Sequence, residues 1–270
     1  MSAALPFTPT PGPRSRQRVL RLRAATFSAI RLAGAEHRRL GCGSASGSRT
    51  PCPGGRQCHD AGMPNVETIR WRGNRDDADP QRRLVVLPGM NFPVTMPLLF
   101  MPCLALANAG WSVWHASWDL SDITHDDAAL MEAVNAAASE LAAAAGASED
   151  GTTVVLAKSV GTLACRWVAY AGLPAVWLTP LVRDKRVVEH VTATMAPALL
   201  IGGAADPSWD QEAAAVTGKQ VIEIADADHA LYSGHWRTYL RTLEDVTDSV
   251  LDFVEGATGA IGMRAQEPSS

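Results

Sequence analysis

The stretch TVVLAKSVGTLA, residues 153–164, changes character at its middle. Its first half is an apolar, β-branched run typical of a buried strand, and its second half reads as small residues entering a helix. Lys158 and Ser159 stand between the halves, so a cation and a hydroxyl follow directly on the strand. In parallel α/β sheets, ligands bind beyond the carboxyl ends of the strands. This stretch therefore predicts a strand–turn–helix unit with a functional group at its turn.

The chain around this unit alternates between short apolar runs and longer helical patterns. Near-continuous apolar strands separated by helices indicate a doubly wound, mainly parallel sheet with helices on both faces. An earlier run, residues 66–71, alternates with period two and is expected to be an edge strand. The other expected strands are residues 83–89, 111–117, 152–157, 175–180, 197–203 and 220–226.

The two ends of the chain differ in composition from its centre. Residues 1–62 carry ten arginines and two acidic residues, whereas the remainder carries 14 basic and 26 acidic ones. Such an Arg-, Pro-, Gly- and Ser-rich segment is typical of a disordered basic leader, either a mis-assigned start upstream of Met63 or a targeting segment. Residues 257–270 are expected to be a disordered tail. We therefore expect one α/β domain over residues 63–256.

Cysteine usage predicts a cytoplasmic protein without a metal. Cys103 and Cys165 fall in apolar helical contexts and are expected to be small core residues. Three other cysteines and a neighbouring histidine lack the paired spacing of a zinc site, so we expect no metal and no other cofactor. No apolar stretch approaches the roughly 20 residues that span a bilayer. We expect neither a membrane nor a nucleic-acid partner. The residues that fail the zinc pattern are Cys42, Cys52, Cys58 and His59.

Ser159 has the sequence setting of a nucleophile. Ala157 and Gly161 flank it in a small-x-Ser-x-small pattern, which is typical of a sharp strand-to-helix turn that exposes a serine hydroxyl at the top of a sheet. Glycine is the usual residue where Ala157 stands. A serine needs a base to act as a nucleophile, so the hypothesis requires a histidine and an acid at neighbouring strand ends.

An acid and a base follow in the order that this architecture requires, serine first, then aspartate or glutamate, then histidine. Asp206 comes after the next-to-last expected strand, and His229 after the last one. His229 is expected to take the serine proton, and Asp206 to orient the imidazole. Two alternatives remain open at this point. Asp206 is also a plausible helix cap with Asp210 as a second acid, and His235 is a rival base.

The oxyanion of an acyl-transfer reaction needs two backbone N–H donors. We expect one from Val160 and the other from Met90 or Asn91, in the loop after the expected strand 83–89. Lys158 allows two interpretations, a solvated charge at the rim or a group that recognises an anionic substrate. The rim charge is favoured, because the turn directs its side chain away from the serine.

The connection over residues 181–196 is too short for a lid, because a crossover between parallel strands already takes about 10–12 residues. Without a lid, no apolar tunnel encloses a long acyl chain, so small or short-chain substrates are expected. Phe92, Met96 and Trp118 are the candidates for the rim of a shallow substrate pocket.

With these residues in place, the chain resembles the α/β-hydrolase superfamily, and within it the small lidless bacterial α/β hydrolases. The resemblance implies a serine esterase that cleaves small carboxylic esters, or amides or thioesters, through an acyl-enzyme. An acyltransferase with the same triad and a non-catalytic binding protein of this fold are the alternatives. Phe92 departs from the usual Tyr, Asn91 from a common Gly, and Ala157 from the elbow Gly. The motifs that carry the resemblance are PGxxY at 88–92 followed by PLL at 97–99, KSxGT at 158–162, TPL at 179–181, GGxxDPxWD at 202–210 and DHxL at 228–231.

Overall fold

The computed structural model describes residues 66–147 and 151–264. They contain a seven-stranded sheet in the order β1-β3-β2-β4-β5-β6-β7. Neighbouring strands are parallel except β1 and β3, which pair antiparallel at the edge where the period-two run predicted an edge strand. The strands are β1 (Val66–Arg70), β2 (Asp79–Leu87), β3 (Trp111–Trp118), β4 (Thr152–Lys158), β5 (Ala175–Leu178), β6 (Ala198–Gly203) and β7 (Gln220–Ile224).

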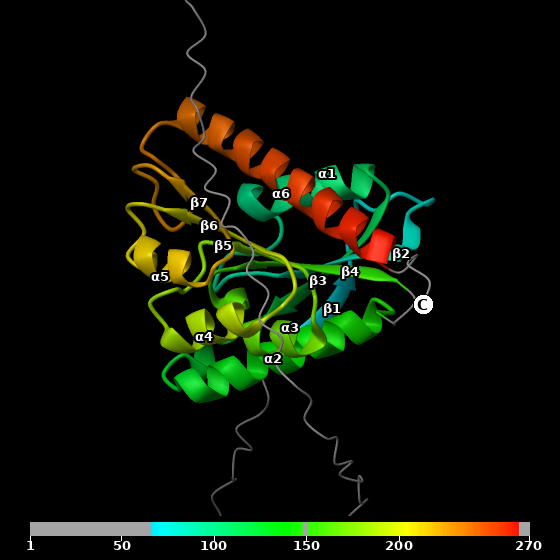
Figure 1. Ribbon diagram of the computed structural model, residues 1–270, viewed down its shortest axis with the longest axis horizontal. Coiled ribbons are helices and arrows are strands. Elements are labelled where there is room, and N and C mark those ends of the chain that lie inside the picture. Colours follow the sequence, from blue (N-terminus) through cyan, green and yellow to red (C-terminus); the bar gives the residue numbers. More distant parts are fainter. Residues whose placement is uncertain (1–65, 148–150, 265–270) are drawn as a thin grey trace, which may run out of the picture. The chain divides into compact units, whose positions relative to one another are not determined.

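Helices cover both faces of the sheet (Figure 1). One face carries α1 and α6, which pack on each other, and the opposite face carries α2, α3 and α4. The helices are α1 (Pro97–Asn108), α2 (Asp127–Ala144), α3 (Cys165–Ala171), α4 (Lys185–Ala193), α5 (Gln211–Val216) and α6 (Trp236–Arg264), with short 3₁₀ turns η1 (Ser121–Ile123) and η2 (Ser159–Ala164). The predicted doubly wound α/β architecture is confirmed.

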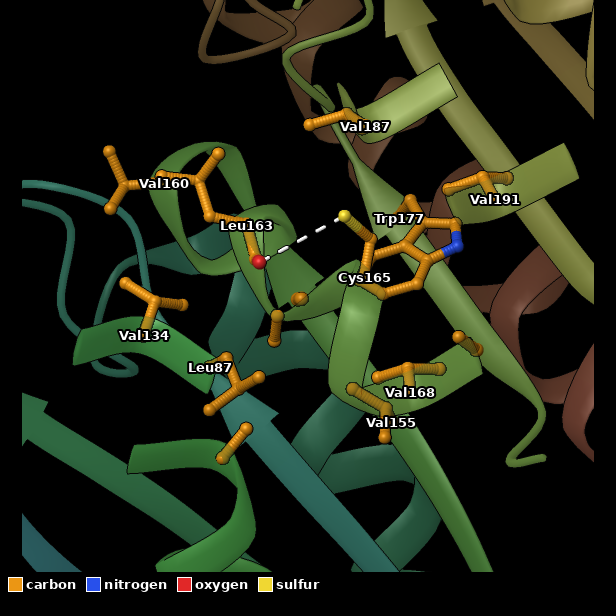
Figure 2. Close-up of a cluster of buried hydrophobic side chains, with 14 of the residues drawn as sticks. Leu87, Val134, Val155, Val160, Leu163, Cys165, Val168, Trp177, Val187 and Val191 are labelled. Carbon is orange, nitrogen blue, oxygen red and sulfur yellow. Dashed lines mark hydrogen bonds between the residues drawn. The ribbon is translucent and has the colours of Figure 1, made fainter. Parts of the chain in front are cut away.

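Two apolar cores lie on the two faces of the sheet. Successive strand residues point to opposite faces, so Leu84 and Val86 of β2 enter the core under α1 and α6, whereas Val85 and Leu87 enter the other. Figure 2 shows part of this second core, where Trp177 of β5 lies beside α3 and α4. Because the central strands β4, β5 and β6 are buried on both faces, their sequences are continuous apolar runs.

The two cysteines of the described domain occupy these cores as predicted. Cys103 belongs to α1 and is fully buried, and Cys165 begins α3 on the other face. The thiol of Cys165 approaches the carbonyl oxygen of Leu163 at 3.9 Å (Figure 2). Burial raises the pKa of the Cys165 thiol to about 12, so it stays protonated at neutral pH.

The carboxyl-terminal boundary differs from the prediction. The expected end of the domain, Gly256, lies inside α6, which continues to Arg264. The apolar stripe of this helix extends through Val250, Val254 and Ala257, all buried, and it carries the helix past the glycine. The expected leader, residues 1–62, lies outside the described residues. Within the described part of the chain, no helix is both long and apolar enough to cross a membrane.

The connection between β5 and β6 holds one helix, α4, and no inserted domain. This agrees with the lidless architecture expected from the length of the segment. In residues 66–147 and 151–264, short exit loops border the carboxyl edge of the sheet. Among them are the β2 exit loop (residues 88–96), the β6 exit loop (residues 204–210) and the β7 exit loop (residues 225–235).

Candidate active site

Ser159, Asp206 and His229 come from three strand ends and meet at the carboxyl edge of the sheet. Ser159 Oγ lies 2.7 Å from His229 Nε2, and His229 Nδ1 lies 2.8 Å from Asp206 Oδ2. An ionised carboxylate only accepts hydrogen bonds, so Nδ1 carries the proton and Nε2 accepts the bond from the serine hydroxyl. The three side chains thus form one hydrogen-bonded chain that ends on a buried acid.

The turn at Ser159 is strained. Its φ of 52° lies in the left-handed region, where a residue with a side chain costs about 1–2 kcal/mol. A Cβ at Gly161 would overlap the carbonyl oxygens of Leu87 and Pro88, so only glycine fits this close approach. Thr162 Oγ1 donates to the Ser159 carbonyl at 2.6 Å and closes the turn. The segment that was expected to enter an α-helix directly begins as the tighter η2, and α3 follows it.

Strain of this kind is concentrated at one edge. Among the described residues, four other non-glycine residues have a positive φ: Asn91, Thr179, Asp226 and Leu231. Each comes after the carboxyl end of a strand, as Ser159 does. Backbone strain persists only where the surroundings enforce it, and it gathers at functional sites. The pattern supports the carboxyl edge as the site.

A pair of glycines brings the acid and histidine loops together. A Cβ at Gly203 would overlap the carbonyl oxygen of Ala227 in the β7 exit loop, and one at Gly202 would overlap the ring of Trp209. Trp209 is fixed in turn, because its Nε1 donates to Glu223 Oε2 at 2.7 Å. The Gly-Gly pair therefore sets the spacing between the loops that carry Asp206 and His229.

Asp206 is held as an anion. It is 3% exposed, and its Oδ1 accepts a bond of 2.8 Å from the backbone N–H of Ser208. Burial alone raises the pKa of its carboxyl, but the hydrogen bonds from His229 and Ser208, together with the charges of His229 and Lys158, lower it below the ordinary value. An ionised partner keeps the proton of His229 on Nδ1.

The two alternative residues lie elsewhere. Asp210 caps α5 and accepts a bond of 3.0 Å from the Ala213 N–H. His235 accepts a bond of 3.2 Å from the Arg237 N–H at the start of α6 and stacks on Trp236. Neither is joined to Ser159 in the structure.

The β2 exit loop lies directly against the turn. Gly89 and Phe92 exchange two backbone hydrogen bonds of 3.3 Å, so the N–H groups of Met90 and Asn91 are at the tip between them. A Cβ at Gly89 would come within 3.3 Å of Ser159 Cβ. Asn91 has a φ of 51°, and asparagine is one of the few residues with a side chain that adopts this conformation routinely. This explains why asparagine can stand where glycine is common.

Val160 is the other expected donor. It follows Ser159 in the first turn of η2, where backbone N–H groups have no partner within the helix. The structure therefore places Val160, Met90 and Asn91 on the two segments that border Ser159.

Lys158 corrects a prediction. It is not a solvated rim charge: it is 1% exposed, and its Nζ donates to the carbonyl oxygen of His229 at 3.1 Å. The same nitrogen lies 4.5 Å from the centre of the Phe92 ring. Burial lowers the pKa of the Lys158 ammonium to about 8, although Asp206 and Asp228 oppose the shift. The β2 and β7 exit loops contact the ammonium, and only the fold brings them there.

The three residues proposed as a pocket rim do not gather in one cluster. Phe92 packs on the core under α1 and α6, whereas Trp118 packs on the core of the other face. Met96 precedes α1 and is 40% exposed. They remain candidates for separate parts of a substrate surface.

Comparison with known proteins supports the fold. Neither a sequence-family model nor a curated protein matches the chain. Solved structures do. Est1E from Butyrivibrio proteoclasticus, with ferulic acid bound, superposes with a TM-score of 0.55 at 14% identity, covering 73% of this chain and 96% of that one. The esterase Pf2001 of Pyrococcus furiosus gives 0.52 at 13% identity over 72% and 93%. A serine hydrolase homologue from Coxiella burnetii gives 0.52 at 10% identity over 69% and 89%. At these identities the likeness shows the fold alone.

Proposed function

We propose that this protein, which has the α/β-hydrolase fold, is a serine hydrolase that cleaves carboxylic esters of small substrates. The observation that carries the proposal is the hydrogen-bonded chain from the strained Ser159 through His229 to the buried Asp206. A binding protein would have no need to hold a serine in a strained conformation against a histidine–carboxylate pair. This favours an enzyme over a non-catalytic member of the fold.

In the proposed reaction, Ser159 Oγ attacks the ester carbonyl carbon while His229 Nε2 takes the hydroxyl proton. The tetrahedral intermediate collapses, the C–O bond of the alcohol breaks, and His229 returns the proton to the leaving alkoxide. Water then attacks the acyl-enzyme and gives one proton to His229. The bond between the acyl carbon and Ser159 Oγ breaks, the carboxylic acid leaves, and His229 returns the proton to Ser159 Oγ. Asp206 stabilises the imidazolium in both halves without accepting its proton.

The negative charge on the intermediate needs preorganised donors. The N–H of Val160 and that of Met90 or Asn91 are our candidates, because Val160 follows Ser159 in η2 and the β2 exit loop packs against Ser159. Removing a single donor of this type in other hydrolases costs about 10²–10³ in kcat.

Water is favoured as the acyl acceptor, and short acyl groups as substrates. The His229 side chain is 35% exposed, so solvent reaches the base, and α4 alone joins β5 to β6, which leaves no lid in that connection. Esters are favoured over amides because one of the similar structures, Pf2001, is named an esterase. Transfer to an alcohol, which uses the same three residues, would appear as a transesterification product.

A fluorophosphonate probe tests the proposal, since it labels only an activated serine. We expect the wild type and Ser121→Ala to be labelled and Ser159→Ala not to be. Ser121 is a suitable control because its hydroxyl also bonds a carboxylate, Asp119 Oδ1 at 2.7 Å, but no histidine activates it. Labelling that persists in folded Ser159→Ala would refute the assignment.

A further inference from the structure

Lys158 is a buried charge that the proposed reaction does not use. Its ammonium lies in the middle of the functional edge: it bonds the main-chain carbonyl of His229 and faces the ring of Phe92. Its side-chain stem supports the start of the β2 exit loop, since a Cβ at Gly89 would come within 3.2 Å of Lys158 Cδ. Its own backbone precedes Ser159. One side chain therefore joins the nucleophile turn to two loops that come from other strands.

A charge in this place is unfavourable for folding. Removing an ammonium from water is costly unless partners replace the solvent, and here they are one carbonyl, one aromatic face and the more distant carboxylates of Asp206 and Asp228. An apolar residue of similar length would fill the same space without that penalty. The contacts therefore point to a role other than stabilising the core.

We infer that Lys158 is a positioning residue, whose ammonium fixes the carbonyl of His229 and the ring of Phe92 relative to Ser159. It thereby keeps both the base, His229, and the candidate oxyanion donors of the β2 exit loop close enough to Ser159 to take part in the reaction. The inference rests on the proposed function in that the geometry it sets is that of an acyl-transfer site. Misplacement by about 1 Å can lower a rate by about 100-fold.

The positioning requires the charged form of the lysine. Above its pKa of about 8, Lys158 loses the cation–π attraction to Phe92 and keeps only a weaker neutral hydrogen bond to His229. The titratable groups that face it are Asp206 from the β6 exit loop and Asp228 and His229 from the β7 exit loop. The β2 exit loop contributes none, because residues 88–96 contain no ionisable side chain. The reaction rate should therefore fall as the pH rises through about 8.

Lys158→Met tests the inference, with Lys219→Met as the matched control. Lys219 is a partly buried lysine at the amino edge of the sheet, and its Nζ, like that of Lys158, donates to backbone carbonyls, here those of Thr194 and Ala196. We expect Lys158→Met to lower kcat/KM for 4-nitrophenyl acetate about 100-fold, mainly through kcat, and to remove the fall in the fluorophosphonate labelling rate above pH 8. Amide exchange should accelerate in residues 88–96 and 225–235. Lys219→Met should change none of these.

The outcomes separate the two proposals. A wild type that no fluorophosphonate labels refutes the proposed function, and the exchange comparison alone then decides whether Lys158 holds the two loops. Unchanged exchange and rate in Lys158→Met overturn the inference, as does faster exchange with an unchanged labelling rate, which would mark a merely structural residue. If the variant does not fold, the wild type still decides. A labelling rate that stays level from pH 7 to 10 overturns the inference.

Discussion

Burial of Lys158 makes the stability of the protein depend on alkaline pH. The pKa of the ammonium falls from 10.5 in the unfolded chain to about 8 in the native structure. Between these values the unfolded chain binds a proton that the native protein lacks, so raising the pH disfavours unfolding. The contribution of Lys158 to stability is fully present above pH 10.5 and is lost as the pH falls through about 8.

The magnitude follows from the shift. Each pKa unit corresponds to 1.36 kcal/mol, so the lowered pKa of Lys158 is worth about 3 kcal/mol across this window. The side chain is 1% exposed, which justifies using the shift without a reduction for solvent screening. In Lys158→Met this dependence is absent. The free energy of unfolding of the wild type, minus that of the variant, should therefore increase by about 3 kcal/mol from pH 7.5 to 10.5.

Urea denaturation of both proteins at several pH values measures the effect, since the other titrating groups contribute equally to both and cancel in the difference. Lys219→Met is a second comparison. Burial also lowers the pKa of Lys219, so this variant too should lose a pH-dependent contribution of the same sign. A difference between wild type and Lys158→Met that stays level across the window would show that Lys158 is hydrated. A difference of the opposite slope would show that its partners, and not its burial, control the charge.

Three further predictions concern the glycines, the strained turn and the open site. Gly203→Ala should lower the free energy of unfolding by about 1–3 kcal/mol and slow fluorophosphonate labelling, because its methyl group pushes Ala227 and the β7 exit loop away. Gly256→Ala, which has no atom near its Cβ, should instead stabilise α6 by up to about 1 kcal/mol in the same urea assay. Equal changes in the free energy of unfolding for the two variants would contradict this prediction. Ser159→Gly and Ser159→Ala should both be inactive, but the glycine variant should be about 1 kcal/mol more stable, since glycine adopts the positive φ without the cost that a side chain imposes. Thermal unfolding compares the two variants, and equal stability would argue against strain at residue 159. Across nitrophenyl esters of increasing length, kcat/KM should stop rising after a few carbons, and an optimum at ten or more would reveal an enclosed acyl tunnel.

The strands were predictable because the sheet is buried on both faces. Each of the seven expected runs corresponds to a strand, with ends that differ by a few residues. The largest difference is at β2, which begins at Asp79 instead of residue 83. Its first residues are polar, and the pairing of Asp79 with Trp111 of β3 leaves no trace in an apolar pattern. An apolar pattern indicates buried residues, whereas the backbone pairing of exposed residues at the start of a strand does not require apolar side chains.

The meeting of Ser159, Asp206 and His229 was predictable for a different reason. Parallel strands deliver their exit loops to one edge, so order along the chain is enough to bring the residues together. The environment of Lys158 was not predictable, because the carbonyl that it bonds lies 71 residues further along the chain. The separate packing of Phe92 and Trp118 was also hidden, since it depends on which face of the sheet each loop turns toward.

The two edges of the sheet reach left-handed backbone in different ways. At the amino edge, turns from a helix into a strand use glycine, as at Gly110 and Gly172. At the carboxyl edge Gly234 is the one described glycine with a positive φ, and otherwise the conformation falls on residues that keep their side chains, Ser159 and Thr179 among them. Substitutions that raise thermal stability by relieving backbone strain should therefore be found mainly at the carboxyl edge. Glycine at a position such as Ser159 would raise the melting temperature but remove the side chain on which the proposed reaction depends. Selection for thermal stability alone would therefore tend to give a more stable but inactive protein.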